Sequence, residues 1–535
     1  MKKTKRFFLL IFLCLSATLF AQNPNREANA ARRAARLNAL PKDEVTRGPF
    51  LQAATNNSIV VRWRTATWAR SRVRYGTAPA NLIFTADDSS LVTEHEVKLT
   101  GLLPRTKYFY SIGTLKDTLE IGNDNYFVTL PVPKTEGVYR IGVFGDCGNG
   151  SPNQKLVRDA FVKYLGNNYM DSWLLLGDNA YQHGSDLQYQ TKFFDVYKDE
   201  FLKKYPLFPS PGNHEYNDIE LTQSYAQLTK QIPYFKNFTM PINGEAGGVP
   251  SKDKGYYAFD IGNIHFLSLD SYGMEQRSLR MYDTLSPQVK WVKKDLEANK
   301  NKGWIIAYWH HPPYTMGSHN SDREQELVKI RENFIRILER YGVDLILCGH
   351  SHAYERSRLM KGYFGPEASF DSSKYNLSQS NGLYDGSKNS CPYIKNAANN
   401  QGTVYVVSGS AGQLTKTTES TFPHNAFYYS NNELSGAVML EVNANRLDLK
   451  WITTDGTVRD KFTMMKNVNQ KTTVRLKKGA STTLSASFIG KYKWNDRPDV
   501  TRDILITPPV GKSTYVVKDE YSCVEDTFEV IVSPK

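Results

Sequence analysis

The stretch Tyr139-Arg140-Ile141-Gly142-Val143-Phe144-Gly145-Asp146-Cys147-Gly148 decides the fold, because it joins a short apolar run to a glycine and a carboxylate. Apolar runs of this length, bounded by turn residues, indicate buried strands. We predict strands at Tyr139–Phe144, Ser172–Leu176, His265–Leu269, Trp304–Trp309, Asp344–Cys348 and Thr403–Ser408. Amphipathic segments between them predict helices at Lys155–Leu165, Ser286–Ala298 and Arg323–Tyr341. This alternation is typical of an α/β or α+β sandwich, over residues 137–455.

Side chains able to bind metals stand at five strand ends of this region. They occur in Gly145-Asp146, Gly177-Asp178-Asn179-Ala180-Tyr181, Gly212-Asn213-His214, Trp309-His310-His311-Pro312 and Gly349-His350-Ser351-His352. Each motif alone has an ordinary explanation, since Asp often caps a helix and Gly-Asn often forms a turn. Together they place donors where open sheets keep their sites. Six of the ten histidines fall in or just after these motifs, which favours a metal site.

This donor set suits the hydrolysis of an anionic phosphate ester. Two cations about 3.5–4 Å apart acidify a bound water and neutralise phosphoryl oxygens, and such close cations need a bridging carboxylate. Asp178 suits the bridge, with Asp146 on one metal and Asn213, His310 and His350 on the other. Mixed nitrogen and oxygen ligands favour Fe, Mn and Zn over Ca or Mg.

The five motifs, in this order, resemble those of the purple acid phosphatases within the calcineurin-like metallophosphoesterases. Residues 349–356, Gly-His-Ser-His-Ala-Tyr-Glu-Arg, are especially close, and the resemblance covers about residues 45–455. It implies a multidomain chain whose central domain is an α-β-β-α metallophosphoesterase sandwich. Relatives in the wider superfamily usually lack a tyrosine at the position of Tyr181, so this residue points to the purple acid phosphatases in particular.

The same resemblance implies a ligand set and two further histidines. Fe(III) at the first site would be bound by Asp146, Asp178, Tyr181 and His352. Zn, Mn or Fe(II) at the second site would be bound by Asp178, Asn213, His310 and His350. His214 resembles the outer-sphere histidine that contacts phosphate or protonates the leaving group, and His319 stands where relatives keep another substrate-contacting histidine.

Some assignments near the motifs stay open. His311 is the alternative ligand to His310, and Cys147 is expected to be a small filler of the core rather than a ligand. Glu215 is expected to orient His214. His95, His183, His265 and His424 receive no role.

We therefore expect a secreted acid phosphatase that hydrolyses phosphate monoesters by direct attack of a metal-bound hydroxide, without a phosphoenzyme. A Gly-x-Ser-x-Gly motif would indicate a serine nucleophile and a covalent intermediate, and the chain contains no such motif. The alternative is a phosphodiesterase or nucleotide phosphohydrolase with the same two metals. A third hypothesis, a non-enzymatic surface protein, would predict lost ligands, whereas every expected ligand is present.

Two strand-rich blocks flank the central region. Residues 45–132 resemble a fibronectin type III domain, with Trp63 as the core tryptophan and Leu102–Tyr110 as a tyrosine-corner strand. Residues 466–535 resemble a small immunoglobulin-like or PKD-like β-sandwich. The polar stretch 357–402 predicts a long loop, and loops of that length are often functional.

The N-terminus predicts export. Basic residues precede the apolar run Phe7–Phe20 and the small residue Ala21, so residues 1–21 read as a cleaved signal peptide and 22–44 as a linker. We expect a periplasmic, cell-surface or extracellular protein with no membrane span. Residues 1–47 hold ten Lys/Arg and three Asp/Glu, hence +7 of the net +13, so the remaining charge suits a small phosphorylated substrate and not nucleic acid. The four cysteines beyond the signal allow one disulfide and require none. The sequence does not indicate an oligomeric state.

Overall fold

The computed structural model describes residues 44–396, 402–417, 422–499 and 501–534. The predicted signal peptide, residues 1–21, and all of the predicted linker except Glu44 lie outside the described residues. Among the helices that the structure describes, none is both long and apolar enough to cross a membrane.

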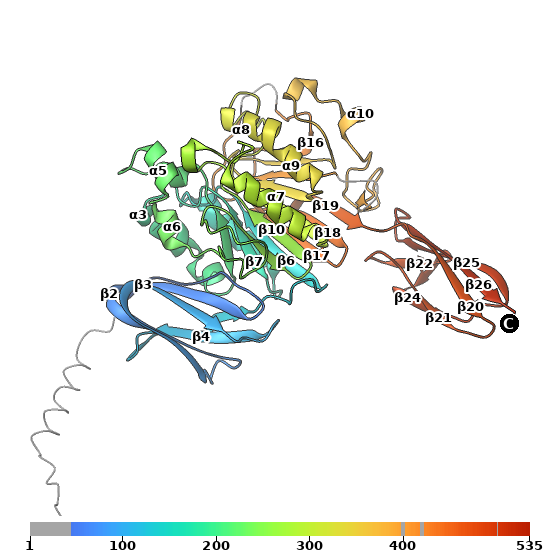
Figure 1. Ribbon diagram of the computed structural model, residues 1–535, viewed down its shortest axis with the longest axis horizontal. Helices are drawn as coiled ribbons and strands as arrows, with labels where there is room; N and C mark the ends of the chain where they lie inside the picture. The colour runs from blue at the N-terminus through green and yellow to red at the C-terminus, as the bar shows by residue number, and fades with distance from the viewer. Residues whose placement is uncertain (1–43, 397–401, 418–421, 500, 535) are drawn as a thin grey trace, which may run out of the picture. The chain divides into compact units, whose positions relative to one another are not determined.

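Two sheets form the centre of the structure (Figure 1). The first has the order β14-β19-β18-β17-β6-β7-β8, with β14 at Tyr393–Lys395, β19 at Val458–Lys466, β18 at Arg446–Thr453, β17 at Gly436–Asn443, β6 at Val138–Phe144, β7 at Ser172–Leu176 and β8 at Leu207–Ser210. The second has the order β16-β13-β15-β12-β11-β10-β9, with β16 at Phe427–Asn431, β13 at Tyr354–Ser357, β15 at Val404–Ser408, β12 at Leu345–Cys348, β11 at Trp304–Trp309, β10 at Ile264–Ser268 and β9 at Tyr257–Ile261. All six strands predicted for this region are confirmed to within one residue at each end.

The strands that carry the metal motifs run parallel within each sheet. In the first sheet β6 pairs with β7 and β7 with β8 in parallel, and in the second β10, β11 and β12 do the same. Parallel neighbours end at the same edge of a sheet, so the residues that follow them gather there.

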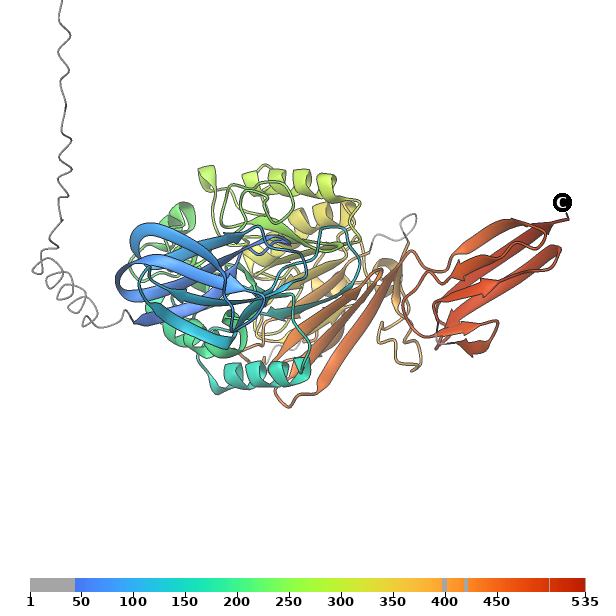
Figure 2. The ribbon, with the colours of Figure 1, turned by 90° about the horizontal axis from the view of Figure 1, so that it is seen from below.

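Burial along β11 shows how the layers stack. Trp304, Ile306 and Tyr308 belong to the core shared with the first sheet. The alternate residues Ile305 and Ala307 belong to the core under the helices α7 (Pro287–Asn299) and α9 (Ile335–Arg340). This period of two fits a strand buried on both faces. Figure 2 shows the sheets between the cyan helix α2 (Pro152–Leu165) on one side and the green and yellow helices on the other, which is the expected α-β-β-α sandwich.

The three predicted helices are present, and one has an irregular centre. Helix α2 spans Pro152–Leu165 and α7 spans Pro287–Asn299, and each begins with a serine whose hydroxyl accepts a hydrogen bond from a first-turn amide. The segment predicted as one helix at Arg323–Tyr341 consists of α8 (Gln325–Lys329), a π-helical stretch (Ile330–Phe334) and α9 (Ile335–Arg340). Apolar periodicity does not distinguish a π-helical turn from an α-helical one, so the sequence did not predict this interruption.

Shorter helices, which the sequence analysis did not predict, lie in the connections. They are α3 (Asp186–Tyr189), α4 (Asp195–Tyr197), α5 (Gln223–Thr229), α6 (Pro233–Asn237), α10 (Ser372–Tyr375), the π-helical stretches at Gln190–Phe194 and Lys198–Leu202, and the 3₁₀ turns at His214–Tyr216, Gln276–Ser278 and Glu367–Ser369.

The N-terminal strands pair with one another in antiparallel fashion and continue the first sheet, because β1 (Val45–Gln52) pairs with β8. They are β1 (Val45–Gln52), β2 (Ser58–Gly76), β3 (Phe84–Thr100), β4 (Lys107–Gly113) and β5 (Thr118–Val128). The Tyr108 hydroxyl accepts a hydrogen bond from the Leu103 N–H at 3.1 Å, the backbone contact of a tyrosine corner. Trp63 is fully buried. Arg47 and Arg64 both pair with Asp186, which attaches the N-terminal strands to the central region.

The C-terminal strands form a five-stranded and a two-stranded sheet. They are β20 (Lys471–Lys477), β21 (Thr482–Ser485), β22 (Tyr492–Trp494), β23 (Arg497–Asp499), β24 (Asp503–Ile506), β25 (Gly511–Asp519) and β26 (Glu525–Ser533). A disulfide joins Cys391 to Cys523, and the Tyr384 hydroxyl donates to Asp519 at 2.9 Å. The predicted 357–402 loop therefore contains short elements, among them β14, and is covalently attached to the C-terminal strands.

Removal of this disulfide is expected to lower stability. Cys391→Ser, Cys523→Ser and the double variant should each lose the same amount, about 2–5 kcal/mol, because each removes the same cross-link. Thermal unfolding with and without a reducing agent provides the measurement. Reduction should lower the midpoint of the wild type and leave that of the double variant unchanged, and equal midpoints for wild type and variants would contradict the prediction.

Candidate metal centre

Three of the predicted donors follow strand ends in left-handed backbone. Asp146 follows β6, Asp178 follows β7 and His350 follows β12, and their φ angles are 55°, 52° and 68°. Left-handed backbone is uncommon for residues other than glycine and concentrates at functional sites. Three separate strand ends thus bend in the same way at the residue that carries a candidate donor.

Asp146, Tyr181 and His352 form one cluster of donor atoms. The Tyr181 hydroxyl lies 2.9 Å from Asp146 Oδ1 and 3.3 Å from His352 Nε2. His352 Nε2 lies 3.7 Å from the same Asp146 oxygen, and its Nδ1 lies 2.9 Å from the Thr415 hydroxyl. The three donor atoms therefore surround one point.

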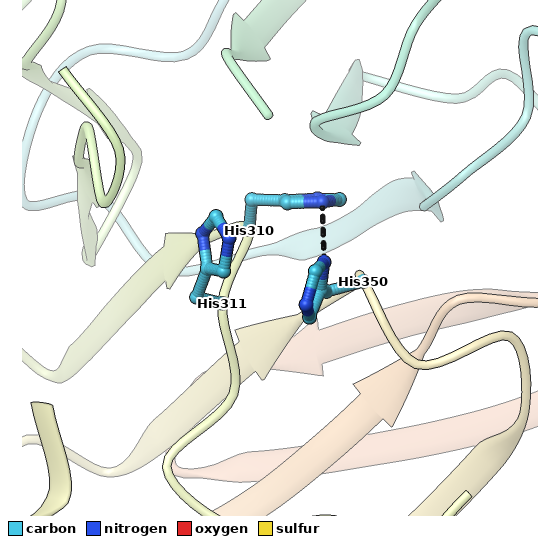
Figure 3. A group of neighbouring side chains, drawn as sticks. All are labelled: His310, His311 and His350. Atoms are coloured by element: carbon cyan, nitrogen blue, oxygen red, sulfur yellow. Dashed lines mark hydrogen bonds between the residues drawn. The ribbon is translucent and has the colours of Figure 1, made fainter. Parts of the chain in front are cut away.

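Asn213, His310 and His350 form a second cluster. Asn213 Oδ1 lies 2.9 Å from His310 Nε2 and 3.1 Å from His350 Nδ1, and the two ring nitrogens are 3.2 Å apart (Figure 3). The opposite nitrogen of His310, Nδ1, lies 2.8 Å from the Leu176 carbonyl oxygen. The carbonyl oxygen can only accept this hydrogen bond, so Nδ1 donates it and Nε2 is the nitrogen that faces the cluster.

Asp178 lies between the two clusters. Its Oδ2 is 3.3 Å from His310 Nε2, and carboxylate oxygens of Asp146 and Asp178 lie within 4.8 Å of each other and of a His310 nitrogen. Its Oδ1 accepts the backbone N–H of His214 at 3.0 Å. A single carboxylate is thus within reach of both donor groups.

These distances fit two cations. Donors about 2.1 Å from an ion and at right angles to one another lie about 3 Å apart, and the separations within the second cluster are 2.9–3.2 Å. Carboxylate, phenol, amide and imidazole donors also match the mixed ligation that iron, manganese and zinc accept.

The ionisation of the site follows from its burial. Burial lowers the pKa of His310, but the neighbouring Asp178 carboxylate outweighs it and raises that pKa to about 9. Burial lowers the pKa of His350 and of His352 to about 3, and His319 adds to the effect in both cases. Burial, with the adjacent Asp146 charge, raises the pKa of Tyr181. His350 and His352 are therefore neutral near pH 7, the form that binds metals.

Glycines make this close approach possible. A Cβ on Gly349 would lie 2.4 Å from Asp146 Oδ2, and one on Gly212 would lie 2.3 Å from Asp178 Oδ1. A Cβ on Gly177 would lie 2.7 Å from His310 Nδ1. Each of these three glycines leaves the space that a donor of another motif occupies.

The structure corrects the expectation for Glu215. Its buried carboxylate accepts the backbone N–H groups of Asp178, Asn179 and Gly212 at 2.7–2.9 Å, so it fixes the loops after β7 and β8. The ring of His214 is instead held through Nδ1, 2.7 Å from the Gln182 carbonyl oxygen. Its Nε2 lies 3.8 Å from Asp178 Oδ2, beside the candidate centre.

The remaining predicted residues lie around the second cluster. The ring of His319 packs against that of His350 at a tilt of 31°, with ring centroids 3.7 Å apart. His311 also lies near His350, at 4.3 Å, but its Nδ1 is 2.9 Å from the Ser271 hydroxyl and its ring stacks on Tyr272. Cys147 is fully buried in the main hydrophobic core, in keeping with a filler.

Glu324 is a neighbour of the site that the sequence analysis missed. Its carboxylate lies 3.0 Å from His319 Nδ1 and 3.2 Å from His350 Nε2. A Glu five residues after a histidine has no distinctive pattern in a loop, so only the occurrence of His319 nearby could have drawn attention to it.

Three family models match successive parts of the chain. "Purple acid Phosphatase, N-terminal domain" matches residues 49–129, "Calcineurin-like phosphoesterase" matches 139–354 and "Iron/zinc purple acid phosphatase-like protein C" matches 402–461. The central part of the chain, which carries the donor clusters, thus matches the calcineurin-like phosphoesterases. Within that class, the chain belongs to the purple acid phosphatase family, whose members have a dinuclear metal centre.

Individual relatives agree with this assignment. Purple acid phosphatase 15 of Arabidopsis thaliana is 31% identical over 294 residues, which are 50% of this chain and 50% of that protein. Acid phosphatase type 7 of Danio rerio is 27% identical over 408 residues, 66% of this chain and 76% of that protein. The solved structure of a purple acid phosphatase from yellow lupin (Lupinus luteus) seeds has the same fold, with a TM-score of 0.61 at 18% identity over 78% of this chain and 74% of that chain. The chain spans about half the length of the first curated relatives it matches.

Gly349→Ala tests the close packing of the donors. The added Cβ would displace Asp146, so we expect metal affinity to fall roughly tenfold or more. The metal content of dialysed protein provides the measurement. Gly122→Ala, where the nearest atom would be 3.9 Å away, is the matched control and should retain its metal. Equal metal content in the two variants would contradict the prediction.

Proposed function

We propose that this protein is an acid phosphatase that hydrolyses phosphate monoesters at a dinuclear centre. The observation that carries the proposal is the position of Asp178 between two clusters, each of which has three further donors. The acid phosphatases among the relatives, by their printed names, support the same activity. Bound cations would supply an activated water and neutralise the charge of the phosphoryl group.

We further propose the ligands and their metals. The first cation would be held by Asp146, Asp178, Tyr181 and His352, and the second by Asp178, Asn213, His310 and His350. A phenolate donor favours a hard ion, so Fe(III) is proposed for the first site, with Zn, Mn or Fe(II) at the second. Cation binding would take the place of the proton that the Tyr181 hydroxyl shares with Asp146.

His214 and His319 are proposed to act on the substrate. His214 Nδ1 donates to the Gln182 carbonyl oxygen, which leaves Nε2 to face the centre. When the ring is protonated, Nε2 can donate to a phosphoryl oxygen or protonate the leaving group. His319, which lies against His350, would donate to the phosphate through Nε2 when its ring is protonated, because its Nδ1 donates to Glu324. Both rings are partly exposed, at 21% and 30%, so a substrate can reach them.

The parts outside the centre complete the proposal. We propose a fibronectin III-like domain at 45–132, a catalytic domain at 137–455 and an immunoglobulin-like or PKD-like domain at 466–535. The Tyr108–Leu103 contact supports the first of these, and β19 extends the catalytic sheet to Lys466. The Cys391–Cys523 disulfide supports export to an oxidising compartment, the periplasm, cell surface or medium, as the proposed signal peptide at 1–21 requires.

The activity is testable with p-nitrophenyl phosphate and His214→Ala. Wild-type protein with both metals should hydrolyse this monoester faster than bis-p-nitrophenyl phosphate, and His214→Ala should lower kcat about 10²-fold or more with unchanged metal content. Faster cleavage of the diester would favour the alternative phosphodiesterase activity. Fully loaded protein that leaves both substrates intact would overturn the proposal.

Tyr181→Phe tests the first metal. Tyrosinate bound to Fe(III) absorbs visible light, so the wild type should be coloured and the variant should lose this band. An absorption spectrum combined with metal analysis provides the measurement. A colourless wild type that is active with zinc alone would refute iron at this site and leave the phosphatase proposal in place.

A further inference from the structure

The side chain of Glu324 touches two histidines of the candidate centre at once. Its Oε2 lies 3.2 Å from His350 Nε2, and both its oxygens lie 3.0 Å from His319 Nδ1. Oε1 also accepts the backbone N–H of Asn320 at 2.9 Å. Glu324 is the residue that precedes helix α8, so the start of that helix sets the position of the carboxylate.

The contact with His350 determines which ring nitrogen can bind a metal. A neutral imidazole carries one proton on its ring nitrogens. Because a carboxylate can only accept a hydrogen bond, the carboxylate beside Nε2 fixes that proton on Nε2. Nδ1 then keeps its lone pair, and Nδ1 is the nitrogen that lies 3.1 Å from Asn213 Oδ1 and 3.2 Å from His310 Nε2. His350 is the one candidate imidazole ligand whose outward nitrogen faces a carboxylate, because His310 faces the Leu176 carbonyl and His352 faces the Thr415 hydroxyl.

The contact with His319 fixes the second ring in the same way. The Glu324 carboxylate at Nδ1 leaves Nε2 of His319 as the nitrogen free for the substrate. The rings of His319 and His350 also pack against each other, so both lie beside the same carboxylate.

We propose that Glu324 is a positioning residue that couples the second metal to the substrate-contacting histidine, by orienting His350 through Nε2 and His319 through Nδ1. This inference rests on the proposed function. One loop residue thereby sets both the affinity of the second site and the approach of the phosphate.

The same three side chains could instead bind a third ion, since their donor atoms lie within 4.8 Å of one another. That use would require His350 to give both ring nitrogens to metals and so to lose both protons, which a neutral imidazole does not do near pH 7. The positioning role needs no such loss.

The experiment compares Glu324→Gln, Glu324→Ala and His319→Ala in the full chain. Zn²⁺ is titrated into metal-free protein against a competing chelator, and steady-state kinetics are measured with p-nitrophenyl phosphate. We expect two ions per chain in the wild type. Glu324→Ala should weaken the second ion about 10–100-fold and leave the first unchanged, because carboxylates that orient metal-bound histidines contribute to that extent. Glu324→Gln, whose amide oxygen can still accept a hydrogen bond from His350, should bind the second ion with an affinity between those of the wild type and Glu324→Ala.

His319→Ala separates the two contacts of Glu324. It removes one histidine and leaves the His350 contact, so Zn²⁺ affinity should equal that of the wild type while KM rises. Glu326→Gln, a partly exposed glutamate two residues further along, is the matched control and should match the wild type in both readouts. Circular dichroism and thermal unfolding of the metal-free variants show whether each one is folded.

The outcomes distinguish this inference from the proposed function. A wild type that binds two ions and hydrolyses the monoester, with folded Glu324 variants of unchanged Zn²⁺ affinity, would overturn the role of Glu324 alone. Binding of three ions by the wild type would overturn it in favour of a third site. A wild type that binds ions but is inactive would remove the phosphatase proposal, and the titration would still measure the effect on His350.

Discussion

The contact between Asp178 and His310, 3.3 Å from Oδ2 to Nε2, is the interaction on which the candidate centre depends. Asp178 follows a strand of the first sheet and His310 follows a strand of the second, so the contact joins the two layers at their common edge. The surrounding structure fixes both partners. Glu215 holds the backbone of Asp178, and the Leu176 carbonyl oxygen holds the ring of His310.

Three buried carboxylates give this edge an unusual electrostatic character. Asp146, Asp178 and Glu215 are at most 1% exposed, and isolated charges at such positions are very unfavourable. Burial raises the pKa of Asp146 and of Glu215, whereas His310 and His214 outweigh burial and lower the pKa of Asp178. Histidines alone offset only part of this negative charge. The proposed pair of cations would offset the rest and so allow the donors to lie this close together.

The sequence predicted the strand ends well because buried parallel strands are continuous apolar runs and the donors follow them directly. In the structure, four of the predicted donors lie beside other members of the ligand sets in which the sequence analysis grouped them: Asp146, Tyr181, Asn213 and His350. Glu324 and the true contacts of Glu215 were missed, because they depend on how loops from different strands meet. The π-helical turn within 325–340 and the pairing of Cys391 with Cys523 were also beyond reach, since neither leaves a periodic signal.

The division of the donors between two sheets has a mechanical consequence. Asp146, Asp178 and Asn213 follow strands of one layer, whereas His310 and His350 follow strands of the other. Ions bound by both groups would cross-link the two sheets at one edge of the sandwich. Any sliding of one sheet past the other would then have to break metal–ligand bonds. Such linkage adds about 2.7 kcal/mol per site when the free ion exceeds its dissociation constant a hundredfold. The free energy of unfolding of the chain would then rise and fall with the concentration of free metal ions around it.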